Sequence, residues 1–237
     1  MSPAPLPKKR VVNHPLPAFA RLRTGRPAVI FDIDGTLVNA VSWTFLTERL
    51  GASVERHLAL YRKLQRRTID TADAIDQLVT AWHKTGNATR NRFTSIFRSM
   101  PIRREAKSTL RNLAAKGYAV CLITGSMDLF ARVTAERLGI RQWYAGSVLR
   151  WDHRGNLAGL DYEHNQSEKK RAQLMQFCKK QGVQPDECAA VGDDWNDCGL
   201  FEATGHGVFY KTAWSDPILA RIAWKRIRSL SELKTIL

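Results

Sequence analysis

The stretch "AVIFDIDGTLVNA", residues 28–40, is an apolar run that leads directly into two acidic residues. Residues 28–31 are short and apolar, which is typical of a buried strand. Asp32 and Asp34 follow at once, and a glycine and a threonine come next. A buried carboxylate costs on the order of several kcal/mol unless something compensates its charge. The stretch therefore predicts a compensating partner at the end of this strand.

The composition is that of a globular chain. The 237 residues are 44% hydrophobic, enough for one large domain or a domain with an insertion. No apolar stretch approaches the ~20 residues that span a bilayer, and no apolar segment follows the basic residues near the N-terminus. We therefore expect a cytoplasmic protein without a membrane span. The four cysteines form no paired motif and are expected to be reduced, buried thiols.

The positive charge is concentrated in two segments of the chain. The net charge is +15, and residues 1–26 contain six Lys or Arg, no acidic residue and several prolines. We expect a disordered basic arm there. Residues 39–109 hold thirteen basic and six acidic residues, which we interpret as a solvated basic face. A weak contact of the arm with nucleic acid or another anionic surface stays open, as does the alternative that the chain is a nucleic-acid-associated protein.

Residues 41–103 are predicted to form a small helical bundle. Four short amphipathic segments follow one another, each with apolar residues at helical spacing. Ser42 is expected to cap the first helix and Gly51 to end it, while Pro101 ends the last one. Since this segment interrupts a different pattern, we interpret it as a cap inserted into another domain.

Strands and helices alternate in the rest of the chain. A predicted β-hairpin turns at residues 154–156, and the other strands are separated by helices. Such alternation predicts a parallel sheet that is covered on both faces. The predicted fold is therefore α/β, with a Rossmann-like core formed by residues 27–40 and 104–237 and with the helical cap inserted between them.

Polar residues follow three predicted strands. In an open parallel sheet these strand ends meet at one edge, where ligands bind. Several acids that converge there need a cation, and hard oxygen ligands favour Mg²⁺. A hydroxyl, a main-chain amide and a lysine suit a phosphate, so the set predicts phosphoryl transfer through an aspartyl-phosphate. The residues at this edge are Asp32, Asp34, Thr124, Gly125, Asp193, Asn196 and Asp197, with Lys169, Lys170 and Arg171 on the helix before the last strand.

Four sequence motifs resemble those of the haloacid dehalogenase superfamily. They are "DIDGTLV", "TGS", the lysine of "KKRAQL" and "GDDWND", in the family's order. The cap after the first motif, the segment "GYAVCLITG" and the late "PIL" resemble the phosphoserine phosphatase branch. The resemblance covers residues 27–237. It implies an Mg²⁺-dependent phosphatase that acts on a small phosphorylated metabolite, with phosphoryl transfer to another alcohol as the alternative.

The resemblance also implies roles for individual residues. Asp32 is the nucleophile, and Asp34 is the general acid and then the general base. Thr124 and the amide of Gly125 hold the phosphoryl oxygens. Lys170 neutralises the developing charge, and Lys169 takes that role if the register differs by one residue.

Further residues are expected around the metal and beneath the cap. The side chains of Asp32 and Asp193 and the main-chain carbonyl of Asp34 are expected to bind Mg²⁺. Asn196 and Asp197 are expected to orient the groups that hold the ion. Trp195 is expected to pack beneath the cap, with a role in shaping the substrate site as the alternative.

Two positions differ from the phosphoserine phosphatase pattern. Val41 stands where that branch has a glutamate for the substrate amino group, and Leu78 aligns with its carboxylate-binding arginine. Both differences remove charges that phosphoserine needs, and the apolar Trp43 and Phe45 are close in sequence. The substrate and the oligomeric state therefore stay open, and the scattered histidines, His57 among them, are assigned no role.

Overall fold

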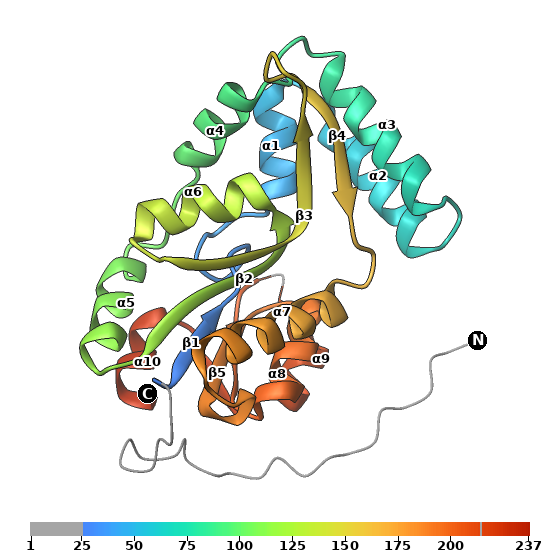
Figure 1. Cartoon of the computed structure of the whole chain (residues 1–237). Coiled ribbons are helices and arrows are strands. Elements are labelled where there is room, and N and C mark those ends of the chain that lie inside the picture. Colours follow the sequence, from blue (N-terminus) through green and yellow to red (C-terminus); the bar gives the residue numbers. More distant parts are fainter. Residues whose placement is uncertain (1–25, 214) are drawn as a thin grey trace.

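The computed structural model describes residues 26–213 and 215–237 as an α/β fold around a seven-stranded sheet (Figure 1). The strand order is β4-β3-β2-β1-β5-β6-β7, and every neighbouring pair is parallel except β3 and β4. The predicted Rossmann-like core with a helical cap is confirmed. The strands are β1 (Ala28–Phe31), β2 (Ala119–Met127), β3 (Gln142–Trp151), β4 (Leu157–Tyr162), β5 (Cys188–Gly192), β6 (Gly207–Tyr210) and β7 (Lys225–Ile227).

Strand β1 lies at the centre of the sheet, and its side chains alternate between two apolar cores. Val29 and Phe31 belong to one core, and Ala28 and Ile30 belong to the other. All four residues are fully buried, as expected for a strand with helices on both faces. The first face is covered by α5 (Ala106–Ala115), α6 (Asp128–Leu138) and α10 (Leu233–Ile236), and the second by α7 (Gln166–Gln181), α8 (Cys198–Thr204) and α9 (Pro217–Ile222).

Four helices lie between β1 and α5, where the sequence predicts them. The side chains of Ser53, Asp70 and Thr89 accept hydrogen bonds from main-chain amides and so cap the second, third and fourth helices. Figure 1 shows these helices beyond the carboxyl ends of the central strands, on both sides of the long hairpin of β3 and β4. They are α1 (Ser42–Leu50), α2 (Val54–Gln65), α3 (Thr71–His83) and α4 (Arg90–Ser99).

The start of α1 differs from the prediction. Val41 occupies the N-cap position, and no side chain caps the helix. Ser42 is the first helical residue, and its hydroxyl bonds to Asp34 instead. The prediction that Ser42 caps α1 is therefore wrong, because a buried carboxylate competes for the hydroxyl. Gly51 ends the helix as predicted, with a φ of 89° that a residue with a side chain rarely adopts.

The predicted hairpin is present and reaches the cap. Strands β3 and β4 pair antiparallel, and Gly155 in the turn has a φ of 80°. Near this turn, the amide of Leu157 donates to the carbonyl of Ala88, and the amide of Arg90 donates to the carbonyl of Gly155. The hairpin thus extends the sheet as a support beneath the cap, which the sequence did not indicate.

Aromatic side chains join the cap to the core. Phe93 packs edge-on against Trp151 of β3 at 5.2 Å, and Phe97 lies 5.2 Å from Phe130 of α6. Trp82 packs on Phe93 and is fully buried. These rings belong to the same apolar cluster as one face of the sheet, so the cap helices are held over the core by continuous packing.

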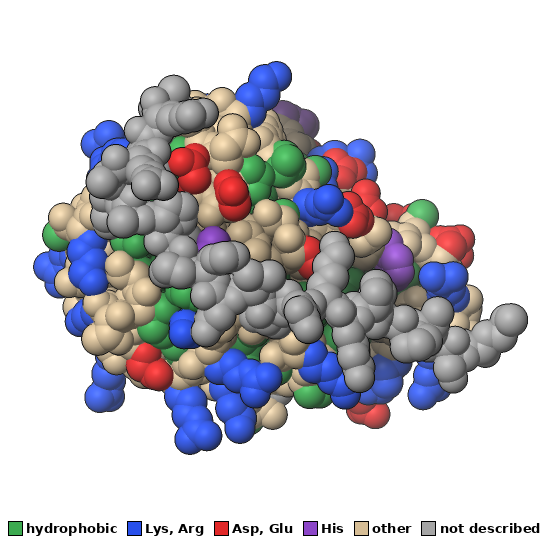
Figure 2. Space-filling model, turned by 90° about the horizontal axis from the view of Figure 1, so that it is seen from below, with side chains coloured by type: hydrophobic (Ala, Val, Ile, Leu, Met, Phe, Trp, Pro, Cys, Tyr) green, Lys and Arg blue, Asp and Glu red, His purple; other side chains and the backbone are tan. Residues whose placement is uncertain are grey.

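The remaining predictions concern the basic arm, the surface charge, the cysteines and membrane-spanning helices. The basic arm lies outside the described residues, apart from Arg26. On the face in Figure 2, Lys and Arg side chains lie mainly along the edges. All four cysteines are free, and only Cys198 is partly exposed. Over the described ranges, every helix is too short or too polar to cross a membrane.

Candidate functional site

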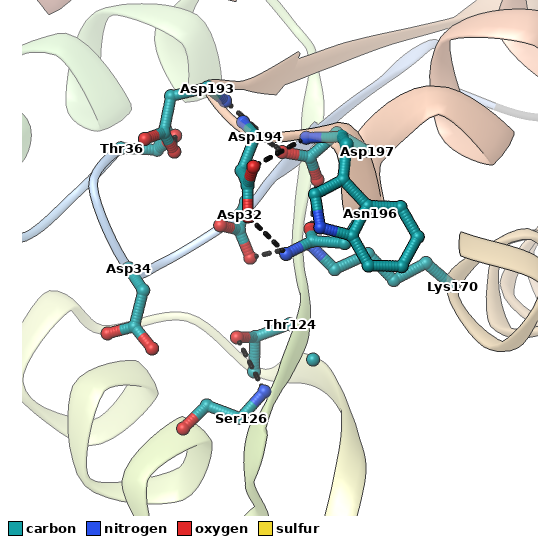
Figure 3. Close-up of polar contacts among 12 residues, drawn as sticks. Asp32, Asp34, Thr36, Thr124, Ser126, Lys170, Asp193, Asp194, Asn196 and Asp197 are labelled. Carbon is teal, nitrogen blue, oxygen red and sulfur yellow. Dashed lines mark hydrogen bonds and ion pairs between the residues drawn. The ribbon is translucent and has the colours of Figure 1, made fainter. Parts of the chain in front are cut away.

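Three buried carboxylates meet at the carboxyl ends of the central strands. Asp32 follows β1, Asp193 follows β5, and Asp197 closes the short 3-10 helix Trp195–Asp197. Oxygen atoms of the three side chains lie within 4.8 Å of one another. Figure 3 shows them converging from separate segments, because parallel strands bring their carboxyl ends to one edge.

Lys170 of α7 is the cation of this cluster. Its Nζ donates to Asp32 Oδ1 at 2.9 Å and to Asp197 Oδ1 at 2.7 Å, and it also donates to Asn196. Burial lowers the pKa of Lys170, but the two carboxylates outweigh burial and hold it above its usual range. Lys169 is exposed, so the structure places Lys170 and not Lys169 beside the acids. One ammonium against three carboxylates leaves the cluster with an excess of negative charge.

The pKa of Asp193 reflects both its burial and this excess of negative charge. Burial, with the nearby Asp32 and Asp197 carboxylates, raises the pKa of Asp193 to about 9, although Thr36 donates to its Oδ1 at 2.9 Å. Asp32 and Asp193 each keep a second oxygen outside these bonds. An all-oxygen set with surplus negative charge fits a hard divalent cation such as Mg²⁺.

The loop after β1 must come very close to Asp193. Gly35 has a φ of 72°, and a Cβ there would lie 2.0 Å from Asp193 Oδ2. Arg103 holds the same loop by donating to the carbonyls of Gly35 and Thr36. The glycine of the first motif is therefore required both by its backbone conformation and by the approach of the acid.

Asp197 organises the loop after β5. Its Oδ2 accepts from the amides of Asp193 at 3.1 Å and Asp194 at 3.4 Å, while Oδ1 accepts from Lys170. The geometry groups Asp197 with Asp32 and Asp193, but its oxygens are already engaged in these bonds. Its contacts orient the other residues, and binding to a metal through Asp32, Asp193 and the main-chain carbonyl of Asp34 stays a prediction.

The side chain of Asp34 lies apart from the cluster (Figure 3), and its partner is Ser42, the first residue of the cap helix α1. Its Oδ1 accepts from the amide of Ser42 at 2.9 Å, and its Oδ2 accepts from the Ser42 hydroxyl at 2.6 Å. The Ser126 hydroxyl lies 2.5 Å from that of Ser42 and completes a buried chain. Burial raises the pKa of Asp34 to about 7; the bonds from Ser42 oppose this effect, and the charge of Asp32 adds to it.

Thr124 and Gly125 lie in β2, opposite the loop after β1. Thr124 is buried, and its hydroxyl accepts from the amide of Ser126 at 3.2 Å. Both residues line the same cavity as Asp32 and Asp34. The predicted phosphate-binding groups thus face the predicted nucleophile across one space.

That cavity has a volume of about 530 Å³ and lies between the core and the cap. Its core end is polar, and its cap end is lined by α1, α2, α3 and the end of β4. Trp195 lines the cavity and interacts with Tyr61 of α2. The contact with Tyr61 agrees with the prediction that Trp195 packs beneath the cap, and its place in the cavity wall also agrees with the alternative, a contribution to the shape of the site.

Sequence reasoning missed several residues of the site. Ser42 was interpreted only as a helix cap, although a serine eight residues after Asp34 could have suggested a contact. Gln166 lines the cavity, and its buried Oε1 lies against Gly125 without a hydrogen-bond partner. His57 also lines it; burial lowers the pKa of His57 to about 4, and Thr47 bonds to its Nδ1 at 2.7 Å. No local signal marks the last two residues.

Comparison with known proteins agrees with this architecture. Residues 27–205 match a family model described as haloacid dehalogenase-like hydrolase. A phosphoserine phosphatase of Archaeoglobus fulgidus is 25% identical over 84% of this chain and 56% of its own length. One from Methanocaldococcus jannaschii is 24% identical over 75% of this chain and 82% of its own length. The chain therefore spans little more than half the length of the Archaeoglobus relative.

Solved structures show the same fold. A phospho-aspartyl intermediate analogue of phosphoserine phosphatase superposes with a TM-score of 0.70 at 20% identity, covering 91% of this chain and 100% of that one. A HAD family hydrolase from Salmonella enterica serovar Typhi gives a TM-score of 0.72 at 17% identity, covering 85% of this chain and 68% of that one. At these identities the likeness concerns the fold alone.

Proposed function

Because the chain belongs to the haloacid dehalogenase-like hydrolase family, we propose that it is an Mg²⁺-dependent phosphatase. The substrate is the phosphate monoester of a small molecule, and the reaction passes through an aspartyl-phosphate on Asp32. The observation that carries the proposal is the position of Asp32. It is buried between Lys170 and Asp193, and it lines the same cavity as Asp34, Thr124 and the cap.

Asp32 is the nucleophile in this proposal. One of its oxygens attacks phosphorus, and the bond from phosphorus to the ester oxygen breaks. Lys170, 2.9 Å from Asp32, balances negative charge on the carboxylate and on the transferred group. Asp32, Asp193 and the main-chain carbonyl of Asp34 would hold Mg²⁺, which would neutralise the negative charge of the cluster that Lys170 alone does not balance. Thr124 and the amide of Gly125 hold the phosphoryl oxygens.

Asp34 moves the proton in both half-reactions. It gives a proton to the departing alkoxide, and it then takes one from the water that hydrolyses the aspartyl-phosphate. Its position supports this role, because Asp34 lines the cavity between core and cap, where a leaving group would sit. The two bonds from Ser42 fix the carboxyl group there. The products are inorganic phosphate and the free alcohol, and Asp32 and Asp34 return to their starting states.

Phosphate release from p-nitrophenyl phosphate tests the proposal. We expect turnover that requires Mg²⁺ and that falls by at least about a thousandfold in Asp32→Asn, because the amide is no nucleophile. Asp161→Asn is the matched control, since Asp161 is an exposed acid whose ion pair with Arg150 is also exposed. Mass spectrometry after rapid quenching should find the phosphoryl group on residue 32. Turnover that survives in Asp32→Asn, or a phosphoryl group on another residue, would contradict the mechanism.

A further inference from the structure

The cap end of the cavity is mostly apolar, with Thr44 and His57 as polar exceptions. Among the described residues that line it, α1, α2 and α3 contribute no Lys, Arg, Asp or Glu side chain. This contrasts with the high basic content of residues 39–109, whose Lys and Arg side chains are exposed except for the half-buried Arg103. The wall opposite the acids includes Val41, Trp43, Leu58, Tyr61, Leu78 and Tyr162.

Three of these side chains are more exposed than large apolar side chains usually are. Val41 is 43% exposed, Leu58 38% and Tyr61 43%, and all three are among the few large apolar side chains of the described residues that are exposed rather than buried or half-buried. Apolar surface gathered in a concave site marks a place where a ligand binds. Their position around one cavity therefore indicates an apolar occupant.

Aromatic packing gives this wall a fixed shape. Trp43 meets Tyr162 edge-on with 5.8 Å between ring centres, and it meets His57 in the same manner at 6.4 Å. On its other side Trp43 stacks on Trp82 at 6.5 Å. Tyr162 comes from the hairpin and Trp43 from α1, so core and cap together form a rigid surface for an apolar group.

A charged leaving group has no partner on this wall. An ammonium or carboxylate that enters an apolar site loses its hydration, and only an opposite charge or several hydrogen bonds compensate that loss. Val41 and Leu78 both line the cavity and supply neither. The volume of about 530 Å³ also lies within the range of pockets that hold drug-sized ligands, and it exceeds the needs of a three-carbon amino acid.

We propose that the substrate is the phosphate monoester of an uncharged, apolar alcohol, whose hydrocarbon part lies against Trp43, Leu58 and Tyr162. This inference rests on the proposed phosphatase function and names the class of its leaving group. The phosphate lies at the acidic end, the ester oxygen faces Asp34, and the hydrocarbon extends beneath the cap. Aliphatic and aromatic alcohols share this chemistry, and the experiment separates them.

A series of n-alkyl phosphates from ethyl to octyl, with phenyl phosphate and phosphoserine, tests the inference. We expect kcat/KM to rise about three- to fourfold per methylene until the cavity is filled, because each buried methylene leaves water. Hexyl phosphate should exceed phosphoserine by at least about a hundredfold. A flat series, or phosphoserine as the best substrate, would overturn the inference while the phosphatase function stands.

Binding provides a second measurement that is independent of turnover. Titration calorimetry of Asp32→Asn with the same alkyl phosphates should show affinity rising with chain length. If no ester is hydrolysed by the wild-type chain, the phosphatase function fails, yet rising affinity still supports an apolar site. Affinity that does not change with chain length would overturn the inference in either case.

Two pairs of variants test whether the preference for longer alkyl chains arises at this wall. Val41→Glu and Leu58→Lys place a charge on the wall, while Val148→Glu and Met175→Lys place the same charges on exposed apolar residues outside it. We expect the first pair to lower kcat/KM for hexyl phosphate at least about tenfold and to change that for ethyl phosphate far less. The second pair should leave both values unchanged. Equal effects of the two pairs would contradict the assignment.

Discussion

The Ser42 hydroxyl donates a hydrogen bond of 2.6 Å to Oδ2 of Asp34, and the Ser42 amide donates one of 2.9 Å to Oδ1. Ser42 is the first residue of α1, so the cap begins at the carboxylate that is proposed to move protons. Because Ser42 donates to Asp34, the Ser126 hydroxyl at 2.5 Å is left to donate to Ser42. The first cap helix and strand β2 thus orient Asp34 together.

Ser42→Ala should lower kcat by about ten- to a hundredfold, because a hydrogen bond to a charged group is worth roughly 1.5–3 kcal/mol. KM should change much less, since Ser42 is buried behind Asp34. Ser42→Thr keeps a hydroxyl and should retain most of the activity. Ser108→Ala is the control, because Ser108 is an exposed serine in the first turn of another helix, α5. An unchanged kcat in Ser42→Ala would mean that the bond does not position Asp34.

Gly35→Ala should abolish activity and destabilise the fold more than Gly155→Ala does. Both glycines have positive φ, 72° and 80°, and both therefore suffer about 1 kcal/mol of backbone strain on substitution. Only at Gly35 does the added Cβ meet Asp193, at 2.0 Å, whereas nothing lies within 4 Å at Gly155. Urea unfolding of both variants measures the difference. Equal destabilisation would show that Asp193 moves away without cost.

Mg²⁺ should stabilise the folded chain, because it binds the clustered carboxylates only when they are brought together. At a concentration of about one hundred times Kd the gain is about 2.7 kcal/mol, which is visible as a higher Tm. Asp193→Asn should lose this rise in Tm, and Asp161→Asn should keep it. EDTA should return the wild-type Tm to its metal-free value. A rise in Tm that is the same in Asp193→Asn would place the ion elsewhere.

His57 should make the free energy of unfolding depend on pH. Burial lowers its folded pKa from 6.5 to about 4, so the unfolded chain binds a proton more readily. The stabilisation by neutral His57 is therefore present above pH 6.5 and is lost as pH falls towards 4, by about 2 kcal/mol between pH 7 and pH 5. His57→Gln should remove this part of the pH dependence. Denaturation curves of both chains at the two pH values measure it; the same loss in both would exclude His57 as its source.

Much of the fold could be predicted from local patterns. The apolar run before Asp32 and the strand–helix alternation after residue 104 predict a parallel sheet, since each buried strand must be apolar on both faces. The helices of the cap follow from apolar residues at helical spacing and from capping residues such as Ser53 and Asp70. The elements after residue 215 are too short to show a period, so the sequence does not predict α9, β7 or α10.

The order of the motifs also predicts that the acids lie at one edge of the sheet. Strand ends are set by the chain itself: an apolar run stops where Asp32 or Asp193 begins, and parallel strands bring such ends together. The site combines carboxylates with one lysine and a hydroxyl. These residue types favour a cation and a phosphate as the bound groups.

Contacts between segments that are distant in the sequence are seen only in the tertiary structure. Lys170 rather than Lys169 faces Asp32 because the rotation of α7 against the sheet selects one side of the helix. Tyr162 reaches Trp43 because β4 lies beside the cap helices, and neither residue carries a local sign of the other. The apolar wall exists only where these segments meet, since packing of whole elements and not the spacing of residues determines which side chains share a cavity.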